Sequence, residues 1–264
     1  MRFAQYAMLS GIGRNRAFHN VLVFKGGNAL DFIWSPNRST RDLDFTVNPD
    51  HDSELPDHDE VRMMMATSLR TTLAQHGLTA RIQKWESFPR RPGNHRFSSI
   101  QATVGFALAD QPLLVQRIQD EQASPQIIPM DISFSDPVCA FVTTRMANGT
   151  ELSVATSDDI AAEKLRALLQ QPLRNRSRRQ DVLDLAVLIR AQALDPAKVA
   201  DFLLRKSVAR DVVVSKAAFR EAEIRQRASD DYDQLEALAR HTFIPFDDAF
   251  ATVLAFVDEL AIPA

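Results

Sequence analysis

The chain has 264 residues, 45% of them hydrophobic and 25% charged, with a formal net charge of −3. This length suits one large domain or two smaller ones, and the small net charge provides no global positive field for non-specific nucleic-acid binding. The single Cys139 excludes an intramolecular disulfide and favours a reducing compartment. Residues 1–16 lack the apolar core of a signal peptide, and no apolar run is long enough to span a bilayer, so we expect a cytosolic protein outside the membrane.

The first half of the chain alternates short strands and helices. We expect a helix at Arg2–Leu9 that ends near Gly11-Ile12-Gly13, then a buried strand at Val21–Phe24 that is followed by Gly26-Gly27. The next elements expected are a helix at Ala29–Trp34, a strand at Leu43–Val47, an acidic loop at Asn48–Asp59, a helix at His58–His76, strands at Leu78–Trp85 and Phe97–Leu108 around a Pro- and Arg-rich loop at Ser87–His95, and a strand at Ile127–Phe134.

The pattern changes to helices after about Glu151. Ser157-Asp158-Asp159 is a strong helix start, because it combines a capping residue with carboxylates in the first turn. The helices expected beyond it are Ile160–Leu169, Gln180–Ala191, Pro196–Arg205, Val213–Arg227, Tyr232–Arg240 and Phe246–Leu260. The fold class is therefore α+β, with a small mixed-sheet core at residues 1–150 and a helical domain at 151–264.

Gly26-Gly27 stands between the first strand and the next helix. Two glycines allow a sharp turn and a close approach of the backbone to a ligand, and a helix that starts there directs free N–H groups at the same place. This arrangement suits phosphate. A Gly-Gly pair is also common in a plain turn, so the motif depends on its context.

Asp42 and Asp44 form a D-x-D pair at the start of the next strand. Residues two apart in a strand share a face, so Leu43 and Phe45 would point into the core while both carboxylates project together. Adjacent carboxylates repel unless a cation lies between them, and oxygen ligands favour Mg²⁺ or Mn²⁺. The alternative is a solvated turn with two surface acids.

Asp131 lies in the apolar strand at Ile127–Phe134, where an acid is costly to bury unless it is paired or binds metal. It could be the third carboxylate of the metal site or the base that receives a hydroxyl proton. An edge-strand acid that faces water is the alternative, and Asp136 is a weaker substitute.

Lys164 lies in the same helical stripe as Ile160 and Leu168. A lysine in an apolar stripe faces a cavity or extends to its edge, so it could bind a triphosphate. It could instead be a surface residue paired with Asp158 or Asp159.

Two further features surround the start of the following helix. Arg174–Arg179 is a short basic loop that could bind a polynucleotide, although such loops are usually only solvated. Asp181 and Asp184 begin the helix, and Asp181 could orient Lys164 or act simply as an acid at a helix start.

These residues resemble the AbiEii/AbiGii toxin family of nucleotidyltransferases, within the DNA polymerase β-like superfamily. The segments that carry the resemblance are Leu22–Leu30, Arg38–Phe45, Asp158–Leu168 and Arg179–Leu185. The resemblance implies a small nucleotidyltransferase core followed by helices, a glycine turn that holds the nucleotide phosphates, Mg²⁺ on the paired aspartates, and active-site roles for the matching Lys164 and Asp181. It also implies a toxin that acts beside an antitoxin, and some family members transfer nucleotides to the acceptor end of tRNA.

The chain departs from the superfamily pattern at two positions. Gly27 stands where serine is frequent, so a phosphate-binding hydroxyl is missing there, and Asn28 stands where the family often has threonine. The backbone donors of the turn are unaffected, and the Asn28 amide could substitute for the hydroxyl.

We therefore expect an enzyme that moves a nucleoside monophosphate from an NTP to a tRNA or protein acceptor. Asp42, Asp44 and Asp131 would bind two Mg²⁺ ions, and Gly26, Gly27 and Asn28 would hold phosphate oxygens. Lys164 and Arg41 would neutralise triphosphate charge, with Asp181 holding Lys164.

Three alternatives remain open. A D-x-D glycosyltransferase would use the metal pair but would leave Lys164 and Asp181 without a role. A degenerate, non-catalytic module would bind a nucleotide or RNA without turnover. The protein could also be mainly the partner-binding half of a toxin–antitoxin pair.

Overall fold

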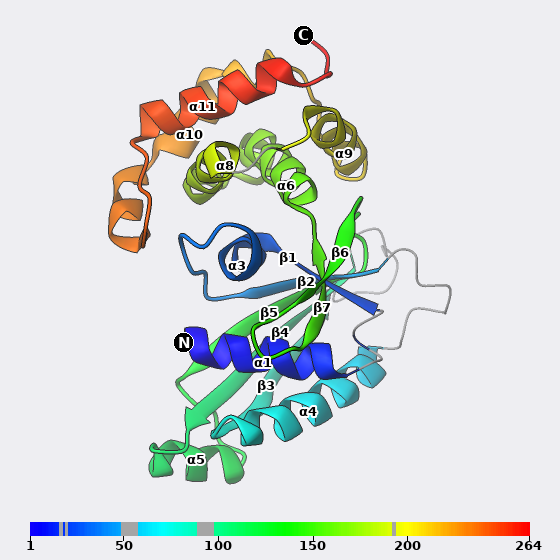
Figure 1. The fold of residues 1–264 in the computed structure, drawn as a ribbon, viewed down its shortest axis with the longest axis vertical. Helices are drawn as coiled ribbons and strands as arrows, with labels where there is room; N and C mark the ends of the chain where they lie inside the picture. Colours follow the sequence, from blue (N-terminus) through cyan, green and yellow to red (C-terminus); the bar gives the residue numbers. More distant parts are fainter. Residues whose placement is uncertain (16–17, 19–20, 49–57, 89–97, 192–193) are drawn as a thin grey trace. The chain divides into compact units, whose positions relative to one another are not determined.

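The computed structural model describes residues 1–15, 18, 21–48, 58–88, 98–191 and 194–264, which divide into two compact units (Figure 1). The first unit comprises Met1–Asn28 and Thr40–Val154, and the second comprises Ala29–Ser39 and Ala155–Ala264. This division differs from the expected boundary at residue 150 mainly in one segment, Ala29–Ser39, which groups with the helical unit.

The first unit is built on a mixed sheet, as the sequence predicts. Its described residues form seven strands in the order β3-β4-β5-β2-β1-β7-β6. The strands are β1 (Leu22–Lys25), β2 (Leu43–Val47), β3 (Leu78–Phe88), β4 (Ser99–Leu108), β5 (Ile127–Ser133), β6 (Phe141–Arg145) and β7 (Glu151–Ala155). β1 runs antiparallel to β2 and parallel to β7, and β2 runs parallel to β5.

Two of these strands, β6 and β7, are missing from the sequence prediction. Both are only five residues long. Leu152, Ser153, Val154 and Ala155 of β7 are all buried, so the strand lacks the alternation that marks a half-buried strand.

Besides the four-residue α3 (Gly26–Ala29), three longer helices accompany the sheet among the described residues, and Figure 1 shows α1 and α4 lying along it. They are α1 (Arg2–Arg14), α4 (His58–Gln75) and α5 (Pro112–Gln119). α4 packs through a buried stripe that contains Val61, Met65 and Leu69, which confirms the predicted helical spacing. α5 is missing from the sequence prediction, and its Leu113 is 86% exposed.

The expected end of the first helix near Gly11-Ile12-Gly13 is wrong, because α1 continues to Arg14. A Cβ at Gly11 would lie only 3.3 Å from both the Ser68 oxygen and the Thr72 Cβ of α4. A Cβ at Gly13 would overlap the backbone oxygen of Glu151. These glycines permit close packing rather than ending the helix.

The second unit is helical. Its described elements are η1 (Leu30–Trp34), α6 (Ser157–Leu169), α7 (Gln171–Arg174), α8 (Arg179–Ala191), α9 (Pro196–Val208), η3 (Ala218–Arg220), α10 (Ala222–Ser229), η4 (Tyr232–Leu238) and α11 (Phe246–Glu259). The Thr156 side chain caps α6 by accepting a hydrogen bond from the Asp159 N–H.

The expected long helix at Val213–Arg227 is wrong. Residues 213–217 are not helical, and a 3₁₀ turn at Ala218–Arg220 precedes α10. β-Branched residues disfavour a helix start here, and the Ser215 hydroxyl accepts a hydrogen bond from the Ala218 N–H, which places the start of the turn. The expected helix at Tyr232–Arg240 is the 3₁₀ element η4.

The two loops expected at Asn48–Asp59 and Ser87–His95 lie mostly outside the described residues. Only their ends are described: Asn48 follows β2, His58 and Asp59 begin α4, and Ser87 belongs to the end of β3.

Polar contacts explain why Ala29–Ser39 belongs to the second unit. Asn37 donates a hydrogen bond to the Thr242 carbonyl (2.9 Å), and its side-chain oxygen accepts bonds from the backbone of His241 and Thr242. The buried Asp31 pairs with Arg240 and accepts a bond from Ser39. The segment therefore shares its polar contacts with residues some 200 positions later in the chain.

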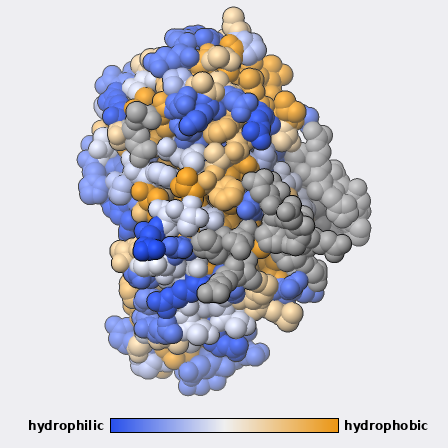
Figure 2. Space-filling view, turned by 45° about the vertical axis from the view of Figure 1, so that its right-hand side comes forward, coloured by the Kyte–Doolittle hydropathy of each residue, from blue (hydrophilic) through white to orange (hydrophobic). Residues whose placement is uncertain are grey.

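The face drawn in Figure 2 carries hydrophilic residues interspersed with smaller groups of hydrophobic ones. Within the described residues, no helix has the length and apolar character needed to cross a membrane.

Candidate active site

Strand pairing brings three acidic residues together in the first unit. Asp44 of β2 stands directly opposite Asp131 of β5, and Asp42 is the residue that directly precedes β2. Carboxylate oxygens of the three residues all lie within 4.8 Å of one another, and each residue is partly buried. The structure therefore assembles the three predicted acids into one cluster, the carboxylate triad.

The electrostatics of the triad favour a bound cation. Burial raises the pKa of the Asp131 carboxyl, and the negative charge of Asp42 raises it further, while the nearby Lys25 acts in the opposite direction. Three oxygen-donor side chains in a partly dry site fit Mg²⁺ or Mn²⁺ better than a soft metal. The donor set therefore fits a divalent hard cation.

Metal binding should be measurable as stabilisation. We expect Mn²⁺ or Mg²⁺ to raise the melting temperature. The free energy of unfolding should increase by about 2.7 kcal/mol when the metal concentration is a hundred times its Kd. Asp131→Asn should stabilise the metal-free protein, because it removes one repelling carboxylate, and should lose most of the metal-induced shift. Thermal melts with and without metal test this, with Asp110→Asn as a control that removes an exposed carboxylate of the same unit. An equal metal shift in Asp131→Asn would contradict the assignment.

Gly26 is required by the position of Asp44. Its φ is +76°, which favours glycine, and a Cβ at this position would overlap the Asp44 carboxylate. A Cβ at Gly27 would lie 2.7 Å from the Thr40 methyl group. Thr40 therefore occupies the space next to the position where a serine side chain would begin.

Asn28 holds the segment that leads into the triad. It is fully buried, and its amide donates hydrogen bonds to the carbonyls of Thr40 (3.1 Å) and Asp42 (2.5 Å) while its oxygen accepts from the Thr40 N–H (3.3 Å). Gln5 adds a bond to the Thr40 carbonyl (2.8 Å). The chain leaves the first unit after Asn28 and returns to it at Thr40, and the hydrogen bonds of Asn28 connect these two points. Its contact with phosphate stays a prediction.

Lys164 is the centre of a buried ionic cluster within the second unit. It is 7% exposed and lies 2.6 Å from Asp181 and 2.9 Å from Asp184. Arg38 forms a second bridge to Asp184 at 2.8 Å. The alternative pairing of Lys164 with Asp159 is not observed, because Asp159 pairs with the buried Lys206 at 3.0 Å.

The cluster keeps its charges through mutual stabilisation. Burial by itself would lower the pKa of the Lys164 ammonium, but the two aspartates outweigh this effect and raise it. Burial would likewise raise the pKa of Asp184, but Lys164 and Arg38 outweigh it and lower it. Lys164 and Asp184 therefore stabilise each other in the charged state.

The predicted site residues fall into two groups. The first unit contains Gly26, Gly27, Asn28, Arg41, Asp42, Asp44 and Asp131, and the second contains Lys164 and Asp181. Arg41 is exposed and directly precedes Asp42 in the chain.

Sequence reasoning assigned no role to Lys25, Arg38 or Asp184. Lys25 directly precedes the glycine turn, and Arg38 lies within a segment that carries the family resemblance, so each stood beside a recognised motif.

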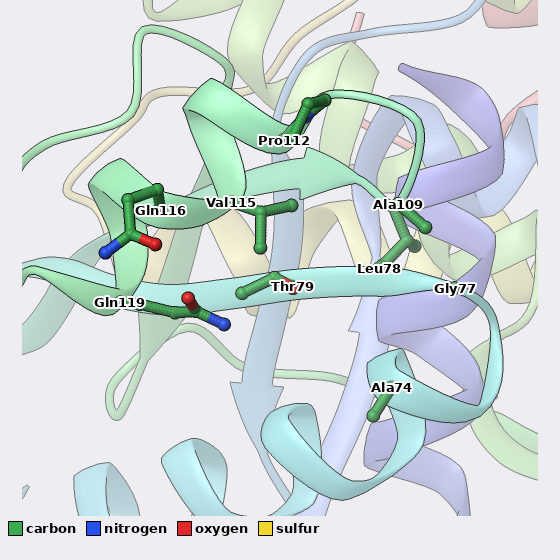
Figure 3. Close-up of a pocket in the computed structure, with 9 residues that line it drawn as sticks. All are labelled: Ala74, Gly77, Leu78, Thr79, Ala109, Pro112, Val115, Gln116 and Gln119. Atoms are coloured by element: carbon green, nitrogen blue, oxygen red, sulfur yellow. The ribbon is translucent and has the colours of Figure 1, made fainter.

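A pocket of about 480 Å³ lies elsewhere in the first unit, among the end of α4, the start of β3 and α5 (Figure 3). Its polar lining comes from Thr79, Gln116 and Gln119, which point from β3 and α5 as labelled in the close-up. None of its lining residues is a predicted site residue or a titratable group, so this pocket adds no acid–base or metal chemistry.

The mixed sheet, the glycines after β1 and the aspartates of the triad match the features that the family resemblance implies for a nucleotidyltransferase core. A family model confirms this class: the family described as "Nucleotidyl transferase AbiEii toxin, Type IV TA system" matches residues 9–254. The chain belongs to this family, and it is a nucleotidyltransferase.

Solved structures agree on the fold. JHP933 from Helicobacter pylori is similar with a TM-score of 0.56 and 14% identity, over 97% of this chain and 88% of that one. A suspected nucleotidyltransferase of H. pylori is similar with a TM-score of 0.55 and 15% identity, over 97% and 90% of the two chains. A comparison with curated proteins found no significant match.

Proposed function

We propose that the protein transfers a nucleoside monophosphate from an NTP to an acceptor hydroxyl, using Mg²⁺ or Mn²⁺ held by Asp42, Asp44 and Asp131. The carboxylate triad carries this proposal, because three acids within 4.8 Å of one another repel strongly unless a cation neutralises them. The divalent metal, when bound, would activate the acceptor hydroxyl and neutralise charge on the leaving pyrophosphate.

The proposed reaction assigns a role to further residues of the first unit. The acceptor oxygen attacks the α-phosphorus, the bond from that phosphorus to the bridging oxygen breaks, and pyrophosphate leaves. Asp131 serves as the third ligand or accepts the hydroxyl proton, and its raised pKa favours proton uptake. The backbone N–H groups of Gly26 and Gly27 hold phosphate oxygens, and the exposed Arg41 neutralises part of the triphosphate charge.

Lys164 and Asp181 are further proposed active-site residues, on the family resemblance. Their buried pairing supports at least the part of the proposal in which Asp181 holds Lys164 in place. The double substitution Lys164→Met with Asp181→Asn separates a catalytic role for Lys164 from a purely structural one.

An RNA acceptor is favoured by the basic loop between α7 and α8, together with Arg174 at the end of α7. Arg174 and Arg176 are exposed, and among the described residues no carboxylate lies within ion-pair distance of either. Such arginines suit the phosphates of a polynucleotide. No comparable feature of the described residues favours a protein acceptor.

RNA binding by this loop gives a direct test. Arg174→Gln with Arg176→Gln should weaken binding of a labelled single-stranded RNA and reduce the slope of log Kd against log salt by about 0.7 for each lost phosphate contact. Fluorescence anisotropy over a salt series measures both. The control is Arg225→Gln, because Arg225 is paired with Asp247 at 2.6 Å. Equal binding by the double variant and the control would exclude the loop as an RNA contact.

The family suggests the biological setting. We propose that the protein is the toxin of a toxin–antitoxin pair, that an antitoxin is its partner and that it acts in the cytoplasm. A neighbouring small open reading frame whose product suppresses toxicity on co-expression would support this. Full toxicity in its presence would count against it.

Transfer itself is tested by incubating the protein with each α-labelled NTP, Mg²⁺ and either total RNA or total protein. Label in the RNA fraction is expected, and it should disappear with EDTA. Label from a sugar nucleotide instead would support a D-x-D glycosyltransferase. NTP binding by calorimetry without transfer to any acceptor would support a non-catalytic module.

A further inference from the structure

We propose that Lys25 binds the phosphate chain of the NTP and that Asp136 is the residue that positions it. This inference rests on the proposed nucleotidyl transfer and adds a cation from the first unit to the substrate-binding set. No part of the family resemblance assigned a role to either residue.

Strand register places Lys25 in line with the triad. Lys25 of β1 stands directly opposite Asp44 of β2, which stands opposite Asp131 of β5. Directly opposed residues of neighbouring strands point to the same face of a sheet, so the lysine and the two aspartates form one row on one face. The positive charge of Lys25 acts to lower the pKa of the Asp131 carboxyl, which agrees with the two side chains lying on the same face of the sheet.

Asp136 fixes where the ammonium group lies. Lys25 Nζ is 2.7 Å from Asp136 Oδ2, and the two side chains are 14% and 17% exposed. The turn after β5 is itself held, because the Thr46 hydroxyl donates to the carbonyls of Ser133 (3.1 Å) and Asp136 (3.0 Å). The Ser133 hydroxyl also accepts a bond from the Asp136 N–H (3.0 Å). Asp136 is therefore held in place by the turn and can position the Lys25 ammonium group.

The chemistry of this position points to phosphate. An ammonium group has three donors, so it can keep its bond to Asp136 while it donates to a phosphate oxygen. A partly shielded lysine gives a stronger charge-assisted bond than one in bulk water. The other lysine expected to meet the triphosphate, Lys164, is already bonded to two carboxylates within the second unit.

The test compares Lys25→Met, Lys25→Arg and Asp136→Asn with the wild type. The control is Lys84→Met, which removes an exposed lysine of β3 that is paired with Glu86 at 3.0 Å. We expect Lys25→Met to weaken NTP binding roughly 10- to 100-fold, as expected for loss of a charge-assisted hydrogen bond, and to leave NMP binding nearly unchanged. Lys25→Arg should retain most of the affinity, and Asp136→Asn should give an intermediate loss. Binding of NTP, NMP and tripolyphosphate is measured by calorimetry with Mg²⁺ present, and KM and kcat are measured where transfer is detected.

Each outcome decides the proposal. Loss of affinity that grows with the number of phosphates supports a phosphate contact, since a merely structural defect would weaken NTP and NMP alike. If Lys25→Met does not fold, Asp136→Asn decides the question: a loss of affinity that grows with the number of phosphates supports the role of Lys25, and unchanged affinity overturns it. Unchanged NTP affinity and KM in folded Lys25→Met overturn the role of Lys25. If the wild type binds NTP through Lys25 but transfers nothing, the proposed function fails while the binding role stands.

Discussion

Replacement of Asp44 by alanine is expected to lower nucleotidyl transfer by roughly a thousandfold or more. Asp44 is the central member of the carboxylate triad, opposite Asp131 in the sheet and two residues from Asp42. Its loss would remove a ligand of the metal, and metal-ion catalysis contributes several kcal/mol of transition-state stabilisation. Transfer of label from an α-labelled NTP to the acceptor measures the effect.

Two controls make the Asp44→Ala result specific. Asp110→Ala removes an exposed carboxylate of the same unit and should transfer at the wild-type rate. Circular dichroism and thermal melts should show a folded Asp44→Ala protein, because the Asp44 side chain is only partly buried and its loss relieves repulsion in the triad. Undiminished transfer by Asp44→Ala would show that the triad is not the metal site of the reaction.

Replacement of Lys164 by methionine is expected to destabilise the protein by about 3–5 kcal/mol. The substitution leaves Asp181 and Asp184 buried without their lysine partner, and an uncompensated buried charge carries a penalty of this size. Arg38 still pairs with Asp184, so the larger share of the penalty falls on Asp181. Chemical denaturation monitored by circular dichroism measures the loss.

The double substitution Lys164→Met with Asp181→Asn separates folding from catalysis. Removing the orphaned charge should restore much of the lost stability, and the double-mutant cycle yields the coupling energy of the pair. If Lys164 also acts on the nucleotide, the double variant will fold but transfer poorly. If it transfers at the wild-type rate, the cluster is structural only. A single Lys164→Met variant of wild-type stability would contradict the buried ion pair itself.

Much of the fold and the centre of the candidate site follow from local sequence patterns. The D-x-D spacing of Asp42 and Asp44 predicts that both carboxylates project to one side, because residues two apart in an extended chain point the same way. The spacing of Val61, Met65 and Leu69 likewise predicts the buried stripe of α4, which the structure confirms. Strand and helix periods are properties of the neighbouring chain, so a single sequence suffices to recognise them.

Local patterns were misleading where packing decides the conformation. Glycines such as Gly11 and Gly13 are typical of a helix end, yet α1 continues through both. They serve packing instead, because α4 and the Glu151 backbone lie too close to α1 for a side chain at these positions. β7 lacks an alternating pattern because it is buried beside β1 in the sheet.

The sequence by itself determined the α+β class, the D-x-D pair and the position of the glycine turn. Only the tertiary structure decided that β5 lies beside β2, which brings Asp131 to Asp44 across 87 positions of the chain. It also decided that Asp184 and Arg38 join Lys164 and Asp181, and that Lys25 lies in line with the triad. The reason is physical: pairing between distant segments depends on how whole surfaces fit and bury charge, and no local period encodes that fit.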